Sequence, residues 1–187
     1  MSKTVSTLAV CFVLACTLWL GSCSKGSKLN RAPEFKLQDA SGQTVSLSDY
    51  RGKVVLLDFW VTWCGHCTIE IPWFMDFEKQ FKDRGFAVLG VSMDEDGWKV
   101  VKPYVANMKM NYRVLLGNDQ VGSLYGGLEA LPTTLLIDRE GRVVSKHVGI
   151  TGGKEDFKNA ILQVLDAPRA SNRVPVRGAV ALLRSPR

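Results

Sequence analysis

The chain has 187 residues, 46% of them hydrophobic, which suffices for one compact domain and is too few for two of ordinary size. Its formal net charge of +6 invites a nucleic-acid partner, but six basic residues lie in the acid-free ranges 1–22 and 167–187, and the remaining 18 equal the 18 acidic residues. Because the middle of the chain is neutral, we expect no nucleic-acid-binding face on the domain.

The first 22 residues have the features of a signal peptide. Lys3 precedes the uncharged apolar stretch 8–20, which has the length of a signal-peptide hydrophobic region and is short for a bilayer span of about 20 residues. The stretch ends at Leu20-Gly21-Ser22-Cys23, which resembles the bacterial lipobox and implies a lipoprotein acylated on Cys23. An uncleaved membrane anchor is the alternative. In either case we expect the domain on the periplasmic side of the cell envelope.

The signal peptide accounts for the odd number of cysteines. Of the five, Cys11 and Cys16 would leave with the signal, Cys23 would carry the lipid, and Cys64 and Cys67 would remain in the domain. One pair cannot supply the four ligands of a cysteine-only zinc site. We therefore expect no metal and interpret the pair as a redox-active disulfide.

The rest of the chain divides into a tether, one domain and a tail. Residues 23–33 are polar and turn-rich, as in a flexible tether, and residues 167–187 follow neither helical nor strand periodicity, which predicts a disordered tail. The domain, 34–166, alternates strands and helices, which predicts a mixed three-layer α/β fold. The expected elements are a hairpin at 35–47, a strand at 54–60, a helix from 64 to 84, a strand at 86–92, a helix from 94 to 108, a strand at 112–116, a helix at 120–125, antiparallel strands at 133–138 and 143–148, and a helix at 157–165.

Several residues depart from these patterns. Asp58 is a charge within the continuous apolar strand 54–60 and needs an explanation. Pro72 is expected to kink the first long helix after its opening turn, and Pro103 to break or bend the second, because proline lacks the amide hydrogen that a helix interior uses. The acidic run 94–96 is expected to start that second helix, where the helix dipole favours negative charge.

The motif Cys64-Gly65-His66-Cys67 opens the first long helix. Unpaired amide groups and the helix dipole stabilise a thiolate there, and cysteines in this setting have pKa values of roughly 3.5 to 7.5. We therefore expect Cys64 to be the exposed nucleophile and Cys67 the shielded cysteine that resolves the mixed disulfide. His66 is expected to stabilise the thiolate and make the couple more oxidising. An exposed histidine of small effect is the alternative.

The run from Val55 to Cys67 closely resembles the active-site strand, loop and helix start of thioredoxin-like proteins. Further segments look like the exported TlpA/ResA branch, namely 32–37, 52–55, 86–125, 131–134 and 137–138, so that the resemblance covers about residues 32–165. It implies a thioredoxin-like α/β/α fold with a mixed central sheet, an N-terminal β-hairpin and a helical insertion before the cis-proline strand.

The same resemblance implies roles for residues away from the motif itself. Pro132 matches the family's cis-proline, which with Leu131 and Thr133 would dock a substrate strand through backbone hydrogen bonds. Asp58 matches the buried acid of thioredoxins. In an apolar strand its pKa should rise, which makes it a candidate proton acceptor for Cys67.

Other residues near the cysteines carry a role or leave a question open. Trp63 resembles the family's active-site tryptophan, which partly covers the disulfide. Glu70 falls where ResA-like proteins keep an acid and is a second candidate base, with a solvated charge on the helix surface as the alternative. The dipeptide Gly65-His66 is typical of protein disulfide isomerases, so the direction of electron transfer stays open.

These observations predict a membrane-tethered thiol-disulfide oxidoreductase that needs no cofactor. Its partners would be exported protein thiols and disulfides and an upstream membrane electron donor or acceptor, and reduction of apocytochrome c before haem attachment is one role. The same site could instead serve a thiol oxidase or disulfide isomerase. A Cu(I) carrier is a weaker alternative because a third well-spaced ligand is lacking. So is a peroxiredoxin, because Val61 stands where that family needs Thr or Ser.

Overall fold

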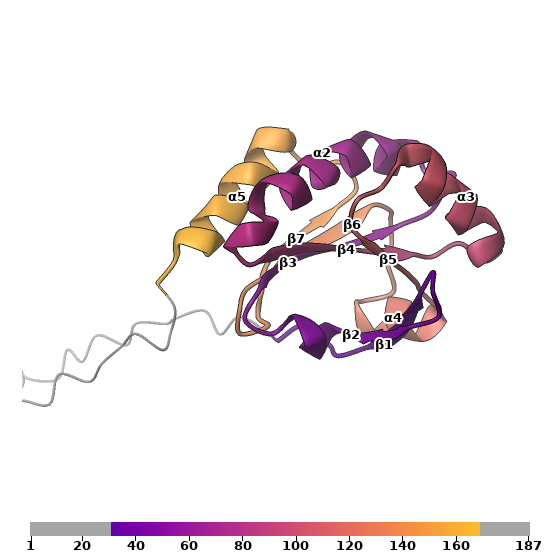
Figure 1. Ribbon diagram of the computed structural model, residues 1–187, viewed down its shortest axis with the longest axis horizontal. Coiled ribbons are helices and arrows are strands. Elements are labelled where there is room, and N and C mark those ends of the chain that lie inside the picture. The colour runs from indigo at the N-terminus through magenta and orange to yellow at the C-terminus, as the bar shows by residue number, and fades with distance from the viewer. Residues whose placement is uncertain (1–30, 169–187) are drawn as a thin grey trace, which may run out of the picture.

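The computed structural model describes residues 31–168 as a seven-stranded sheet with helices on both faces (Figure 1). The predictions for the signal peptide, for Cys23 and for nearly all of the tail lie outside the described residues. The elements are β1 (Lys36–Asp39), β2 (Thr44–Ser46), η1 (Leu47–Tyr50), β3 (Val54–Trp60), α2 (Gly65–Phe81), η2 (Lys82–Arg84), β4 (Phe86–Ser92), α3 (Trp98–Met108), β5 (Arg113–Leu116), α4 (Asp119–Leu124), β6 (Thr133–Ile137), β7 (Val143–Val148) and α5 (Lys154–Asp166).

The sheet is mixed, with strand order β2-β1-β5-β4-β3-β6-β7. Strands β3, β4 and β5 are parallel, and the other neighbouring pairs are antiparallel. Every residue of β3 and β4 is buried, which explains their almost unbroken apolar sequences, because a strand covered on both faces needs no polar side. The predicted thioredoxin-like fold is confirmed, including the N-terminal hairpin and the helix α4 before β6.

Alternate residues of β3 face opposite sides of the sheet. The core beneath α2, α3 and α5 takes from β3 the residues Val54, Leu56 and Trp60, and the core on the side of α4 takes Val55, Leu57 and Phe59. Figure 1 shows α2, α3 and α5 together on one face and α4 on the other. By this alternation Asp58 faces α2, the helix that begins at the cysteine motif.

The second long helix starts later than the sequence predicts. Helix α3 begins at Trp98, after Gly97 with φ 58°, so the acidic run 94–96 precedes the helix instead of forming its first turn. The reason is local: the Asp94 side chain accepts hydrogen bonds from Thr62 and from Ser92. This carboxylate thus holds the loop after β3 instead of capping a helix.

Neither proline interrupts its helix. Helix α2 continues through Pro72 to Phe81, and α3 continues through Pro103 to Met108, so the predicted break at Pro103 is wrong. Both prolines lie on exposed positions, and so do the residues four before them. Water can therefore bond the carbonyl groups that the missing amides leave free.

Over residues 31–168 the structure contains no helix long and apolar enough to cross a membrane.

Candidate active site

Cys64 and Cys67 are joined by a disulfide at the start of α2, with their Cα atoms 5.3 Å apart. Cys64 is the N-cap residue of the helix, and its Sγ accepts a hydrogen bond from the Cys67 backbone N–H at 3.1 Å. The first-turn amides and the positive end of the helix dipole therefore point toward the Cys64 sulfur. This arrangement stabilises negative charge on Cys64 when the disulfide opens.

The two sulfurs differ in their access to solvent, although less than the sequence predicts. Cys64 is 8% exposed and Cys67 is 1% exposed, so the expectation of a freely exposed Cys64 is wrong. Cys64 lies instead in a pocket of about 520 Å³, whose walls come from the cysteine loop and from the segment before β6. The lining residues are Val61, Trp63, Cys64, Gly65, His66, Leu128, Glu129, Ala130 and Leu131. A partner must enter this pocket to reach the Cys64 sulfur.

The loop that carries the motif is held by a residue that the sequence analysis did not assign to the site. Asp94 follows β4 and is 8% exposed. Its carboxylate accepts bonds from the Thr62 backbone N–H at 3.0 Å, from Thr62 Oγ1 at 2.6 Å and from Ser92 Oγ at 2.8 Å. The one sequence signal for this role is the position of Asp94 just after a buried strand. The carboxyl ends of adjacent parallel strands meet at one edge of the sheet, so an acid there lies close to the end of β3.

The segment before β6 forms the opposite wall of the pocket. The Leu131–Pro132 peptide bond is cis, as the resemblance implied, and Leu131 lines the pocket with Cys64. Thr133 is buried, and its Oγ1 donates to the Ala130 carbonyl at 2.7 Å. Its side chain therefore braces the loop and does not reach into the pocket.

Two carboxyl groups are buried between the sheet and α2: Asp58 comes from β3, and Glu70 comes from α2, three residues after Cys67. Asp58 and Glu70 are each 1% exposed. Asp58 Oδ1 accepts a hydrogen bond from Thr134 Oγ1 at 3.2 Å, whereas neither Glu70 oxygen has a partner in the described part of the chain. The alternative that Glu70 is a solvated surface charge is wrong.

Burial raises the pKa of both groups because it removes the water that stabilises their charged forms. For Asp58, burial and the negative charge of Glu70 raise the pKa to about 8, and the bond from Thr134 opposes the rise. Burial raises the pKa of Glu70 to about 7. The site therefore contains two acids that can exchange a proton near neutral pH.

The remaining motif residues form the rim of the pocket. Trp63 is 80% exposed, so its indole flanks the pocket as a free apolar surface and covers little of the disulfide. Gly65 and His66 are exposed at the start of α2. The structure therefore places the site residues predicted within 58–133 in four groups: the rim, the disulfide, the buried carboxyls and the cis-proline loop.

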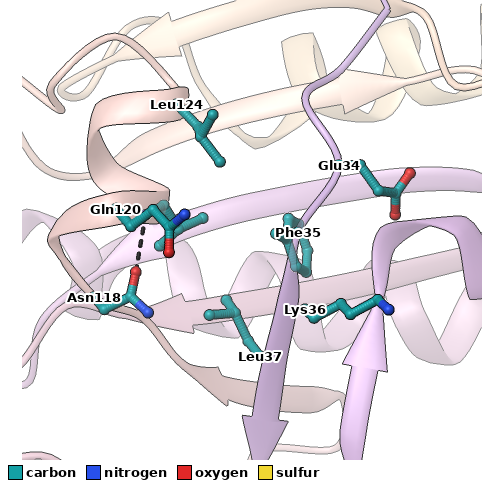
Figure 2. Close-up of a pocket in the computed structure, with 8 residues that line it drawn as sticks. Glu34, Phe35, Lys36, Leu37, Asn118, Gln120 and Leu124 are labelled. Carbon is teal, nitrogen blue, oxygen red and sulfur yellow. Dashed lines mark hydrogen bonds between the residues drawn. The ribbon is translucent and has the colours of Figure 1, made fainter.

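A second cavity lies away from the disulfide. It has a volume of about 310 Å³ and lies between β1 and α4, where Figure 2 shows Phe35 and Leu37 facing Leu124. Asn118, also on its wall, caps α4 by accepting a bond from the Val121 N–H at 2.9 Å. None of the predicted site residues lines this cavity, so the disulfide pocket is the candidate site. Within residues 31–168, no group of three or more His, Cys, Asp or Glu side chains is placed to hold a metal ion.

Comparison with known families gives the same assignment as the geometry. The model of the AhpC/TSA family matches residues 29–146. The chain belongs to the AhpC/TSA family. The chain carries a Cys64–Cys67 disulfide on the fold of that family, and relatives at least 30% identical to it are named thiol-disulfide oxidoreductase ResA. It is a thioredoxin-like thiol-disulfide oxidoreductase of the ResA type.

Relatives of this AhpC/TSA-family chain carry matching names. Thiol-disulfide oxidoreductase ResA of Bacillus subtilis (strain 168) is 39% identical over 130 residues, which are 68% of this chain and 69% of the relative. Among solved structures, a protein described as thiol:disulfide interchange protein DsbE from Chlorobium tepidum is similar with TM-score 0.68 and 36% identity, covering 73% of this chain and 96% of its own. The exposed lipoprotein thioredoxin Etrx1 of Streptococcus pneumoniae has TM-score 0.61 and 28% identity, covering 70% and 99%.

Proposed function

We propose that this chain is a membrane-tethered reductase of disulfides in exported proteins. The observation that carries the proposal is the asymmetry of the pair: Cys64 opens into a pocket, whereas Cys67 is closed off in a core with two proton-accepting carboxyls. In this arrangement one cysteine attacks a partner and the other completes the exchange.

The proposed reaction has two steps. The Cys64 thiolate attacks one sulfur of a substrate disulfide, which forms a Cys64–substrate disulfide and releases the first substrate thiolate. Cys67 then loses its proton to Asp58 or Glu70 and attacks the Cys64 sulfur, which closes the Cys64–Cys67 disulfide and releases the second substrate thiolate. Two electrons pass from the enzyme to the substrate, and a membrane donor returns them.

The surface of the pocket suits an extended peptide. Leu131 offers backbone groups next to Cys64, and Trp63 provides an exposed ring on the other side. A substrate segment that pairs with Leu131 would place its own cysteine over the Cys64 sulfur, as in other cases of strand addition. Pro132 and Thr133 support this role by holding the shape of the loop.

The sequence and one of the similar structures support a location in the cell envelope. The lipobox-like Leu20–Cys23 supports export and acylation of Cys23, and one similar structure is that of an exposed lipoprotein thioredoxin. ResA and DsbE are names of proteins that exchange disulfides. The chain would then act in the cell envelope, and apocytochrome c is the candidate substrate that its resemblance to the TlpA/ResA branch implies.

A Cys67→Ala variant tests the proposal directly. It keeps the Cys64 nucleophile but lacks the cysteine that resolves the intermediate, so a Cys64–substrate disulfide should accumulate in cells and reveal the partner on a non-reducing gel. A Cys64→Ser/Cys67→Ala double variant is the matched control and should trap nothing. Equal capture by both variants, or none by either, would argue against a protein substrate.

The reduction potential of the pair tests the direction of transfer. A potential near or below about −230 mV supports the reductase, and one well above about −180 mV reverses the direction and favours an oxidase or isomerase. The dipeptide Gly65-His66 favours the second outcome. Equilibration of the purified chain with glutathione buffers, followed by thiol counting, gives the value.

A further inference from the structure

Four unpartnered polar atoms lie beneath helix α2. They are Trp60 Nε1, the two carboxylate oxygens of Glu70 and the Tyr112 hydroxyl, and they are four of the six buried side-chain nitrogen and oxygen atoms without a hydrogen-bond partner in residues 31–168. All three side chains are at least nine-tenths buried. Since an unpaired buried polar atom destabilises the folded state, a group of them calls for an explanation.

Two of these three side chains, Trp60 and Tyr112, meet over one patch of the sheet. Asp58 and Trp60 are two residues apart on β3 and face the same side. Gly90 of β4 is paired with Asp58, and a Cβ atom at Gly90 would lie 3.0 Å from Trp60 Nε1 and 3.0 Å from Tyr112 Cε2. The indole N–H and the edge of the phenol ring therefore meet above Gly90, next to Asp58.

The carboxyl groups lie within electrostatic reach of this patch. Burial raises the pKa of Tyr112 well above its usual value, and the negative charge of Asp58 adds to the rise. Glu70 of α2 raises the pKa of Asp58 in the same way. The groups facing Asp58 are thus Glu70 and the cysteine pair from α2, Thr134 from β6 and Tyr112 from the segment before β5. No Lys or Arg of the described residues is buried.

The unpartnered atoms complement one another chemically. The indole N–H is a donor, the phenol both donates and accepts, and the carboxylate oxygens accept. They do not bond to each other directly, so a molecule that links them must be small and must both donate and accept. Buried water has this chemistry, and it occupies polar sites with two to four partners.

Tyr104 lies next to this patch and has a hydroxyl group that is bonded near the surface. The Tyr104 ring of α3 packs on Trp60, with ring centroids 5.2 Å apart. The Tyr104 hydroxyl and Thr68 Oγ1 share a hydrogen bond of 3.1 Å. Thr68 Oγ1 also donates a hydrogen bond to the Cys64 carbonyl oxygen at 3.2 Å. Thr68 is exposed. Tyr104 therefore lies between the buried patch and solvent, beside the start of α2.

We propose that ordered water binds beneath α2 to four side chains: Trp60, Tyr112, Asp58 and Glu70. Tyr112 is a positioning residue. Through this water it orients the two carboxyl groups that take the proton of Cys67. The inference rests on the proposed function. The proton leaves the Cys67 sulfur, binds a carboxylate oxygen and passes through the water toward Tyr104 and solvent, and no electron moves with it. The hydroxyl of Tyr112 favours the charged carboxylate by donating to the water that bonds it.

A Tyr112→Phe variant tests this role because it removes one oxygen and keeps the packing. The resolving step should be about three- to tenfold slower at pH 7, and its pH profile should shift upward by roughly half to one pH unit, since each unit is a tenfold change in proton affinity. Tyr50→Phe is the matched control, a half-buried tyrosine away from the patch, and should leave the profile unchanged.

A second variant and a second measurement separate this inference from the proposed function. Gly90→Ala would place a methyl group against Trp60 Nε1 and the Tyr112 ring, so it should shift the profile in the same direction as Tyr112→Phe.

In the wild-type chain, nuclear Overhauser contacts between the Trp60 indole proton and bound water should appear whether or not the chain turns over a substrate, and should weaken in Tyr112→Phe. An unchanged pH profile in Tyr112→Phe, or an indole proton without water contact in the wild type, would overturn the inference. A wild type that binds this water and exchanges no disulfide would overturn the proposed function alone.

Discussion

Asp58 and Glu70 are two carboxyl groups that are shielded from water and sense each other's charge. Two like charges in a site of low dielectric do not ionise together easily, so the pair holds a proton at a pH where an exposed carboxyl has lost it. A group whose pKa lies near the working pH can both accept a proton and release it again. This pair therefore suits proton exchange with Cys67 better than a solvated acid would.

Removing either carboxyl should slow the resolving step. Asp58→Asn or Glu70→Gln leaves one base in place, so we expect the rate to fall roughly 10- to 100-fold, which is less than the usual 100- to 10,000-fold contribution of a general base. Decay of the mixed disulfide between Cys64 and a peptide, followed by rapid acid quenching from pH 6 to 9, measures this step. Glu78→Gln is the control, since Glu78 is a half-buried acid of the same helix, and a drop of equal size there would contradict the assignment.

The same burial makes stability depend on pH. The folded-state pKa of Asp58 is raised from 3.8 to about 8, so the folded chain holds a proton that the unfolded chain releases, and stability falls as the pH rises from about 4 to 8. Asp58→Asn removes this loss. We expect the variant to gain on the wild type by up to roughly 6 kcal/mol at pH 9, at about 1.4 kcal/mol per pH unit, and to match it near pH 3. Urea unfolding of the oxidised forms at both values measures the gain, and an equal difference at both would refute it.

At the scale of elements, the loop from β3 into α2 depends on Asp94. Its carboxylate is the common acceptor for Thr62 and Ser92, so it ties the ends of two parallel strands together beside Cys64. Asp94→Ala would leave these donors buried without a partner. We expect a loss of roughly 2 to 4 kcal/mol of stability and a lower rate of attack by Cys64, because the loop no longer holds the sulfur in the pocket.

Chemical unfolding together with peptide-disulfide reduction checks the Asp94 prediction. Glu95→Ala is the matched control, since Glu95 is the next acid in the run and is exposed; it should change neither quantity by a measurable amount. If Asp94→Ala kept both wild-type stability and wild-type rate, the loop would be held by its backbone alone.

The order and type of the elements could be predicted from the sequence. For each element, the spacing of its apolar residues and its length indicate the same type of structure. The errors concern places where a side chain has a tertiary partner. The acidic run 94–96 has the composition of a helix start, but Asp94 is bonded to a loop about thirty residues away in the sequence, and no local pattern contains that partner. Pro72 and Pro103 are tolerated because their side of the helix faces solvent, which depends on how the helices pack.

At the scale of the whole molecule, the site joins segments that are distant in the sequence. Asp58, the cysteine motif and Pro132 could be predicted because each carries a residue type that is unusual in its local setting or matches a family motif. The burial of Glu70 could not, since a glutamate on a helix of weak amphipathic character fits either face. The role of Tyr112 could not be predicted either. An aromatic residue at the start of a strand is ordinary, and only the folded sheet brings Tyr112 close to Asp58.

Under the proposed function, the position of the chain in the cell depends on Cys23, which precedes the described residues. If Cys23 carries acyl chains after cleavage, burial of those chains holds the domain on the membrane surface, and Cys23→Ser should move the protein from the membrane fraction to the soluble envelope fraction. Its rate of disulfide exchange in detergent should stay that of the wild type, because the fold from Arg31 onward does not include the anchor. Cys11→Ser is the matched control, because Cys11 lies inside the apolar stretch and would be removed with the signal peptide. A Cys23→Ser protein that remained in the membrane would instead establish an uncleaved N-terminal anchor.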